Sequence, residues 1–141
     1  MAASVVTPAE NLAVARAWIQ AMVEHDAKKM GAMAASDVKV LEVAEGEVHV
    51  GRDFLIWAYE DLFTGYPDCS CEIINDFAGE DQVMVEVQRR GTETGEFRGQ
   101  PPSGGKVDLR IGYVFRLADG RISAVTEYYD AATLEKQLGS F

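Results

Sequence analysis

The sequence predicts an α+β domain in which a curved sheet wraps around helices from the first half of the chain. Apolar residues recur at helical spacing over residues 8–33 and 51–65. Almost all of the second half alternates between apolar and polar residues with a period of two, with short turns between the segments. Helices first and long antiparallel strands afterwards are typical of α+β domains, and a sheet curled around helices leaves a cone-shaped interior.

The composition predicts one domain and restricts the kinds of partner. The chain has 141 residues, 48% of them hydrophobic, which is enough for one core and too short to expect two, so residues 1–141 are expected to form a single domain. The net charge of −10 argues against nucleic acid and membrane partners, because it repels phosphate backbones and anionic lipids. No signal-peptide pattern or long apolar run is seen, so a cytoplasmic location is expected.

The first predicted element is a helix over residues 8–24. Thr7 is suited to the N-cap, Pro8 to the first helical position, and Glu10 completes a capping box. One stripe of this helix is apolar, with Trp18 at its border: Leu12, Ala15, Ile19, Met22 and Val23. Asp26 is then expected to cap a short second helix.

Two strands and a third helix are predicted next. From Ser36 the period changes to two, and Val38, Val40 and Glu42 share one face of a strand. A turn at residues 45–46 leads to a short strand over residues 47–50. The third helix is expected to run to Gly65, with an apolar side formed by Phe54, Trp57, Ala58 and Phe63.

Four strands and a final helix are predicted in the second half. The strands cover residues 69–78, 82–92, 106–117 and 121–130, and Asp119-Gly120 is a hairpin signal between the last two. The Gly- and Pro-rich loop at residues 94–105 is interpreted as a lid or a dimer contact. A short helix over residues 131–138 ends the chain.

Cofactor and metal sites are not expected. Cys69 and Cys71 lie two apart in a predicted strand, so they share a face and are expected to be reduced, buried thiols. His25 and His49 are separated from each other and from the acids, with no recognisable metal spacing. The sequence also has no phosphate loop or dinucleotide fingerprint, so any catalysis is expected to be cofactor-free.

Three motifs in order carry a family resemblance over nearly the whole chain. They are Gly-Thr-Glu-Thr-Gly-Glu-Phe-Arg-Gly-Gln-Pro-Pro-Ser-Gly at residues 91–104, Phe-Arg-Leu-Ala-Asp-Gly-Arg-Ile at 115–122, and Asp130 followed by Gln-Leu-Gly at 137–139. With them the chain resembles the SnoaL-like polyketide cyclases. That family is similar in fold to nuclear transport factor 2, ketosteroid isomerase and limonene epoxide hydrolase, so the resemblance implies the same cone-shaped fold. One fold hosts many activities, so the site has to decide the function.

The resemblance to the cyclases implies a set of site residues. Their acid/base Asp, which is thought to assist an intramolecular aldol closure, falls on Glu127, and a more widely shared Asp falls on Asp130. The His and Gln that accompany the base fall on Tyr113 and Ile111, and a pocket Asn falls on Val40. The acid is therefore kept as a longer Glu, whereas its polar companions are replaced.

The same comparison with ketosteroid isomerase gives a second candidate base. Its general-base Asp falls on Glu42, its oxyanion Tyr on Trp18, and its protonated Asp at or near Tyr113. A tyrosine hydroxyl and an indole N–H are able to donate hydrogen bonds to an enolate. In the loop, the His of many family members is Glu93 here.

The candidate carboxylates and aromatic residues each have a functional and a structural interpretation. An aromatic cone lined by Trp18, Trp57, Tyr113, Phe115 and Tyr129 would raise the pKa of a carboxylate by desolvation. The alternative is that the carboxylates of Glu127 and Glu42 lie outside the sheet in solvent and that the aromatic residues are core. Asp130 stands where the last strand meets the final helix, so it is interpreted first as an N-cap.

These observations lead to one functional hypothesis and two alternatives. The hypothesis is a cofactor-free cyclase or isomerase for a small apolar carbonyl or polycyclic compound, with Glu127 as general base and Tyr113 steadying the enolate. The alternatives are a non-catalytic module that binds a small hydrophobic ligand, and an epoxide hydrolase, which needs paired acids with Arg or Asn around a water. The family resemblance also implies a homodimer formed through the outer face of the sheet.

Overall fold

The structure is a computed structural model that describes residues 6–139, and it confirms the α+β prediction. The elements, in order, are α1 (Pro8–Val23), α2 (Ala27–Ala32), β1 (Ala34–Glu42), β2 (Glu47–Val50), α3 (Arg52–Gly65), β3 (Ser70–Ala78), β4 (Gln82–Thr92), β5 (Lys106–Ala118), β6 (Arg121–Tyr128) and α4 (Ala131–Gln137). Among the described residues, no helix combines the length and apolar character needed to cross a membrane.

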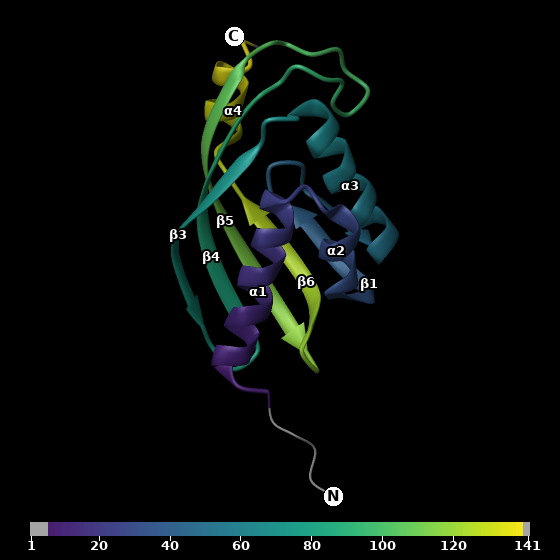
Figure 1. The fold of residues 1–141 in the computed structure, drawn as a ribbon, viewed down its shortest axis with the longest axis vertical. Helices are drawn as coiled ribbons and strands as arrows, with labels where there is room; N and C mark the ends of the chain where they lie inside the picture. The colour runs from purple at the N-terminus through teal and green to yellow at the C-terminus, as the bar shows by residue number, and fades with distance from the viewer. Residues whose placement is uncertain (1–5, 140–141) are drawn as a thin grey trace, which may run out of the picture.

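The six strands form one mixed, curved sheet in the order β2-β1-β6-β5-β4-β3. β1 pairs in parallel with β6, and all the other neighbours are antiparallel. Figure 1 shows α1 in front of this sheet, α2 and α3 to one side, and α4 at the end of the molecule where β5 begins. The parallel pair joins an early strand to the last one, and it makes Glu42 the direct neighbour of Glu127.

The caps of α1 and α2 follow the sequence, whereas the buried stripe of α1 differs from the predicted one, since Val23 is 39% exposed and Trp18 lies within the buried face and not at its border. The Thr7 hydroxyl accepts a hydrogen bond from the Glu10 amide at 3.1 Å, and the Asp26 carboxylate accepts one from the Lys29 amide at 3.0 Å. These bonds satisfy N–H groups that lack partners inside the helices. The side of α1 that packs on the sheet contains the fully buried Trp18.

The buried face of α3 differs from the prediction. Leu55, Tyr59 and Leu62 are buried, whereas the side chain of Trp57 is 55% exposed. The expectation that Trp57 lines the interior is therefore wrong. Apolar residues occupy two adjacent stripes of this helix, one position apart, so periodicity alone does not distinguish the stripe that faces the core from the one beside it.

An aromatic cluster fills the centre of the core. Trp18 makes edge-on contacts with Tyr59, Tyr113 and Phe115, with ring centroids 5.2 to 5.5 Å apart. Such edge-to-face pairs add to the stabilisation from burial. The expectation of free thiols is confirmed in the described residues, since Cys69 is buried and Cys71 half-buried, and neither forms a disulfide.

The loop of residues 93–105 is fixed to the C-terminal end of α3. The buried Glu93 accepts hydrogen bonds from the Tyr66 hydroxyl and the Ser103 amide, each at 2.9 Å. The Gly95 amide donates to the Gly65 carbonyl at 3.1 Å. A Cβ on Gly95 would lie 2.0 Å from the Thr64 carbonyl oxygen, so the close approach requires glycine at that position.

Candidate active site

A cavity of about 270 Å³ lies between α3, the inner face of the sheet and the 93–105 loop. One part of its wall is apolar and is formed by Val40, Phe54, Ala58, Leu62, Val107, Leu109, Ile111 and Leu134. The other part carries titratable and hydrogen-bonding groups, chiefly Glu42, Glu45, Arg89, Arg98, Glu127 and Tyr129. A mostly apolar wall with a few converging polar groups is typical of a small-molecule site.

The inner cluster consists of Glu127, Arg89 and Tyr113, from β6, β4 and β5. Arg89 Nη2 lies 2.6 Å from Glu127 Oε1 and 2.5 Å from the Tyr113 hydroxyl. The Tyr113 hydroxyl donates to the same Glu127 oxygen at 3.2 Å. Alternation along each strand turns all three side chains to the concave face, and Tyr113 and Glu127 are direct partners across β5 and β6.

Burial dominates the electrostatics of the inner cluster. The pKa of Glu127 is raised above its ordinary value of 4.5, because burial disfavours the charged carboxylate, although the Arg89 guanidinium opposes that rise. Burial also raises the pKa of Tyr113, so its hydroxyl keeps its proton. Arg89 Nε is buried and has no hydrogen-bond partner among the described residues.

The rim cluster consists of Glu42, Tyr129, Arg98 and Glu45, near the ends of β1 and β6 and on the loop. Arg98 Nη2 lies 2.6 Å from Glu42 Oε2, and Nη1 lies 3.0 Å from Glu45 Oε2. The Tyr129 hydroxyl donates a hydrogen bond to the other Glu42 oxygen. Burial, followed by the hydrogen bond to Glu42, raises the pKa of Tyr129.

The two clusters place a pair of carboxylates side by side. Glu42 and Glu127 are Cα partners in the parallel pair of β1 and β6, and neighbouring strands lie roughly 4.8 Å apart. Both side chains line the cavity and both are 15% exposed. The negative charge of Glu42 contributes to the raised pKa of Glu127, after burial. Two neighbouring acids in different environments are a common arrangement for acid/base chemistry.

The structure separates the remaining sequence candidates into three groups. Val40, Ile111 and Tyr129 lie on the cavity wall. Trp18 and Phe115 are fully buried in the aromatic core and are not part of that wall, and Tyr113 reaches the site through its bond to Glu127. The side chain of Trp57 is exposed and belongs neither to the cavity wall nor to the aromatic core.

Asp130 is the N-cap of α4, as the sequence indicates. Its carboxylate accepts hydrogen bonds from the Ala132 amide at 3.1 Å and the Thr133 hydroxyl at 2.8 Å. These bonds, with that from Thr133 first, lower the pKa of Asp130, and the residue is not among those lining the cavity.

Neither arginine of the site is among the residues predicted from the sequence. Arg89 continues the inward alternation of Val83, Val85 and Val87, so its position in the strand was a signal that a charged residue points into the core. Arg98 carries no such signal, because it stands in an irregular loop with a φ of 52° and its partners are 53 and 56 positions away.

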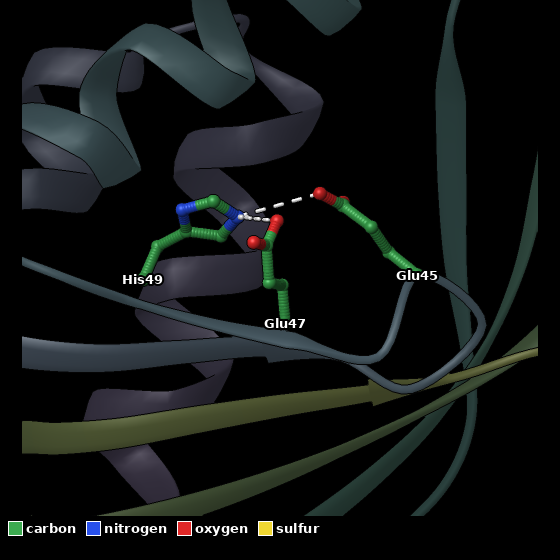
Figure 2. A group of neighbouring side chains, drawn as sticks. All are labelled: Glu45, Glu47 and His49. Atoms are coloured by element: carbon green, nitrogen blue, oxygen red, sulfur yellow. Dashed lines mark hydrogen bonds and ion pairs between the residues drawn. The ribbon is translucent and has the colours of Figure 1, made fainter.

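A small cluster of possible metal ligands lies at the β1–β2 hairpin. Figure 2 shows the carboxylates of Glu45 and Glu47 directed toward the ring of His49, with His49 Nε2 3.3 Å from Glu45 Oε1 and 3.9 Å from Glu47 Oε2. The ring of His49 stacks on Phe54 with centroids 4.0 Å apart. Because Glu45 is already paired with the Arg98 guanidinium, whose charge opposes a second cation, this cluster is better described as a polar network joined to that ion pair.

Comparison with known proteins places the chain among solved cone-shaped folds. A SnoaL-like polyketide cyclase from Jannaschia sp. CCS1, provisionally named as such, has a TM-score of 0.87 at 19% identity, with 100% of this chain and 99% of that chain covered. AclR from Streptomyces galilaeus, provisionally called a hydroxylase, has a TM-score of 0.82 at 22% identity, with 96% and 84% covered. At these identities the likeness shows the fold alone.

A third similar structure has a ketosteroid isomerase-like fold. It is a hypothetical protein with a ketosteroid isomerase-like fold from Catenulispora acidiphila DSM 44928, with a TM-score of 0.75 at 19% identity and 95% of each chain covered. No curated protein matches the sequence. The family model for SnoaL-like polyketide cyclases matches residues 12–138, which is most of the chain. This protein therefore belongs to the SnoaL-like polyketide cyclase family.

Proposed function

We propose that this protein is a cofactor-free acid/base enzyme for a small apolar carbonyl compound, with Glu127 as its general base. The observation that carries the proposal is the inner cluster: a buried carboxylate on the cavity wall whose pKa is raised and whose position is fixed by Arg89 and Tyr113. A base with a raised pKa takes up a substrate proton more readily than an ordinary glutamate does.

The first step is removal of a proton from the carbon next to the substrate carbonyl. A Glu127 oxygen takes the proton, and the electron pair of the broken C–H bond forms an enolate. Negative charge thus moves from Glu127 to the substrate oxygen. Arg89, which lies 2.6 Å from the carboxylate and also lines the cavity, is placed to neutralise the charge before and after this transfer.

The second step returns the proton from Glu127. In an isomerisation, the enolate is protonated at another carbon. In an intramolecular aldol reaction, the enolate carbon bonds to a second carbonyl carbon, and the resulting alkoxide takes the proton. Tyr113 acts here as a positioning residue, because its hydroxyl bonds to Glu127 from beneath the wall and is not itself part of the lining.

The test combines ligand screening with proton exchange. Thermal-shift screening of cyclic ketones, steroids and terpenoid lactones finds ligands, since a compound at 100 times its Kd adds about 2.7 kcal/mol of stability. Exchange of the protons next to the carbonyl in D₂O, followed by NMR, then measures base catalysis without knowledge of the product. Glu127→Gln should slow this exchange by roughly 10²–10⁴-fold while the protein stays folded. Exchange at the wild-type rate would exclude Glu127 as the base.

Epoxide hydrolysis is a second candidate function, and one observation favours it. Glu42 and Glu127 are neighbouring acids, each paired with an arginine on the cavity wall. Such a set is able to activate a water and to protonate the epoxide oxygen. Incubation of epoxides in H₂¹⁸O distinguishes the two candidates, because only hydrolysis yields an ¹⁸O-labelled diol.

Two further expectations concern binding and assembly. A non-catalytic binding module would take up ligands with no proton exchange and no hydrolysis, which the same measurements reveal. A homodimer through the outer sheet face is expected from the family, and light scattering at micromolar concentration that finds only monomer would refute it.

A further inference from the structure

The cavity is small, and the charged groups that meet in it are already paired with opposite charges. Its volume is about 270 Å³. Five charged side chains that meet in it are the carboxylates of Glu42, Glu45 and Glu127 and the guanidiniums of Arg89 and Arg98. Each of these five groups already lies within 3.0 Å of an oppositely charged partner. Arg90 also belongs to the lining, but its side chain is 53% exposed and pairs with Asp108.

The volume limits the number of rings in the ligand. An apolar protein cavity of about 150 Å³ takes up benzene, which has six carbon atoms. In proportion, a cavity of about 270 Å³ has room for roughly eleven non-hydrogen atoms. That is the size of a bicyclic ketone, and a third fused ring would have to lie outside the cavity or displace its wall.

The ion pairs limit the charge of the ligand. A substrate carboxylate would have to draw Arg89 or Arg98 away from its acid, and a substrate ammonium would have to draw an acid away from its guanidinium. At the buried pair of Arg89 and Glu127, either exchange leaves one partner without its counter-charge, which is strongly unfavourable. A neutral carbonyl or hydroxyl group needs only a hydrogen bond and leaves both pairs intact.

The distribution of polar groups sets the orientation. The acids and arginines line one part of the wall, and Leu62, Val107, Leu109 and Leu134 are among the apolar residues of the other part. A ligand that fits both parts has an apolar ring face and its oxygen on one edge. We infer that the substrate is a neutral one- or two-ring carbonyl compound, smaller than a linear three-ring system, bound with its oxygen on the polar part of the wall, where the guanidiniums of Arg89 and Arg98 are able to donate hydrogen bonds. This inference rests on the proposed function, since it concerns the same cavity.

Calorimetry with four compounds tests size and charge together. The compounds are 2-tetralone, anthrone as the three-ring ketone, tetralin-2-carboxylate as the anion and 2-aminotetralin as the cation. We expect 2-tetralone to bind, anthrone to bind at least tenfold more weakly, and each ion to bind roughly 100-fold more weakly. No binding of 2-tetralone, or tighter binding of anthrone or of either ion, would overturn the inference.

A cavity-enlarging variant sharpens the size argument. Leu109→Ala removes part of the apolar wall and should improve anthrone binding more than 2-tetralone binding. Val114→Ala on the same strand is the matched control, because Val114 is on the opposite face and is not part of the lining. If Leu109→Ala does not fold, Leu134→Ala on the half-buried side of α4 gives the same readout. Equal gains in the variant and the control would count against the size limit.

Failure of this inference differs from failure of the proposed function. Calorimetry needs no turnover, so the order of affinities stands even if Glu127→Gln exchanges protons at the wild-type rate. Conversely, tight binding of a three-ring or charged compound would contradict the size and charge limits while leaving the base assignment to the exchange assay.

Discussion

The inner and rim clusters use the same chemical groups in different surroundings. Each contains a glutamate, an arginine and a tyrosine, and the two glutamates are direct neighbours across β1 and β6. The Arg89 side chain in the inner cluster is 14% exposed, whereas the Arg98 side chain in the rim cluster is 43% exposed. Buried ion pairs are little screened by water, and exposed pairs contribute little to stability. From this difference we expect the inner cluster to have the larger effect on the proposed chemistry and on stability, and the rim cluster to have the smaller one.

The largest difference between the clusters is expected in activity. Glu127→Gln removes the proposed base and should lower proton exchange by roughly 10²–10⁴-fold. Glu42→Gln removes a neighbouring charge and should lower it by about fivefold, the equivalent of about 1 kcal/mol. Rate measurements at saturating ligand test this order. Equal losses in the two variants would assign a shared role to the carboxylates.

The next difference is expected in stability. Arg89→Met leaves the buried Glu127 carboxylate without its counter-charge and should lower the free energy of unfolding by about 3–5 kcal/mol. Arg90→Met is the matched control, because the neighbouring side chain is 53% exposed and should change stability by at most about 0.5 kcal/mol. The Arg89 effect should shrink when Glu127→Gln is added. Urea unfolding of the single and double variants measures this coupling, and simple additivity would contradict it.

The pH dependence should distinguish the inner acid from an ordinary glutamate. Since the pKa of Glu127 is raised, the low-pH limb of activity should lie above pH 4.5, and activity should fall as the pH drops through the raised pKa. The folded state then binds this proton more tightly than the unfolded state does. The contribution of Glu127 to stability is therefore fully present below pH 4.5 and is lost as the pH rises through the raised pKa. The free energy of unfolding of the wild type should therefore fall, relative to that of Glu127→Gln, as the pH rises through this range.

A smaller effect is expected at the rim. Arg98→Gln breaks the pairs with Glu42 and Glu45, but these pairs are partly open to solvent, so stability should change by less than about 1 kcal/mol. The change should shrink further in 1 M salt, whereas the effect of Arg89→Met should persist. If Arg98→Gln lost the same stability in 1 M salt as in low salt, the rim pairs would behave as buried ion pairs, contrary to this prediction.

The smallest effect is expected at Asp130. Asp130→Ala removes two capping hydrogen bonds from α4 and should lower the Tm slightly without changing proton exchange. Asp130→Asn, which keeps a capping side chain, should restore most of the Tm. A large loss of the proton-exchange rate in either variant would indicate that Asp130 takes part in the reaction.

The predictions from sequence succeed where a local pattern is sufficient. Thr7, Asp26 and Asp130 act as helix caps because capping depends on the few residues around them. The alternation of β4 and β5 likewise assigns each side chain to one face of the sheet. Local spacing was insufficient for α3, where two apolar stripes compete and packing exposes Trp57.

By itself, the sequence determined the order of the elements, the caps and the inward side of each strand, because these follow from helical and strand periods over a few residues. Only the tertiary structure decided the composition of the site. The parallel pairing of β1 with β6 brings Glu42 next to Glu127 across 85 positions, and Arg89 reaches the same carboxylate from two strands away. Arg98 arrives on a loop with no regular period. Contacts between distant segments depend on how the whole sheet curves around its helices, so no local pattern encodes them.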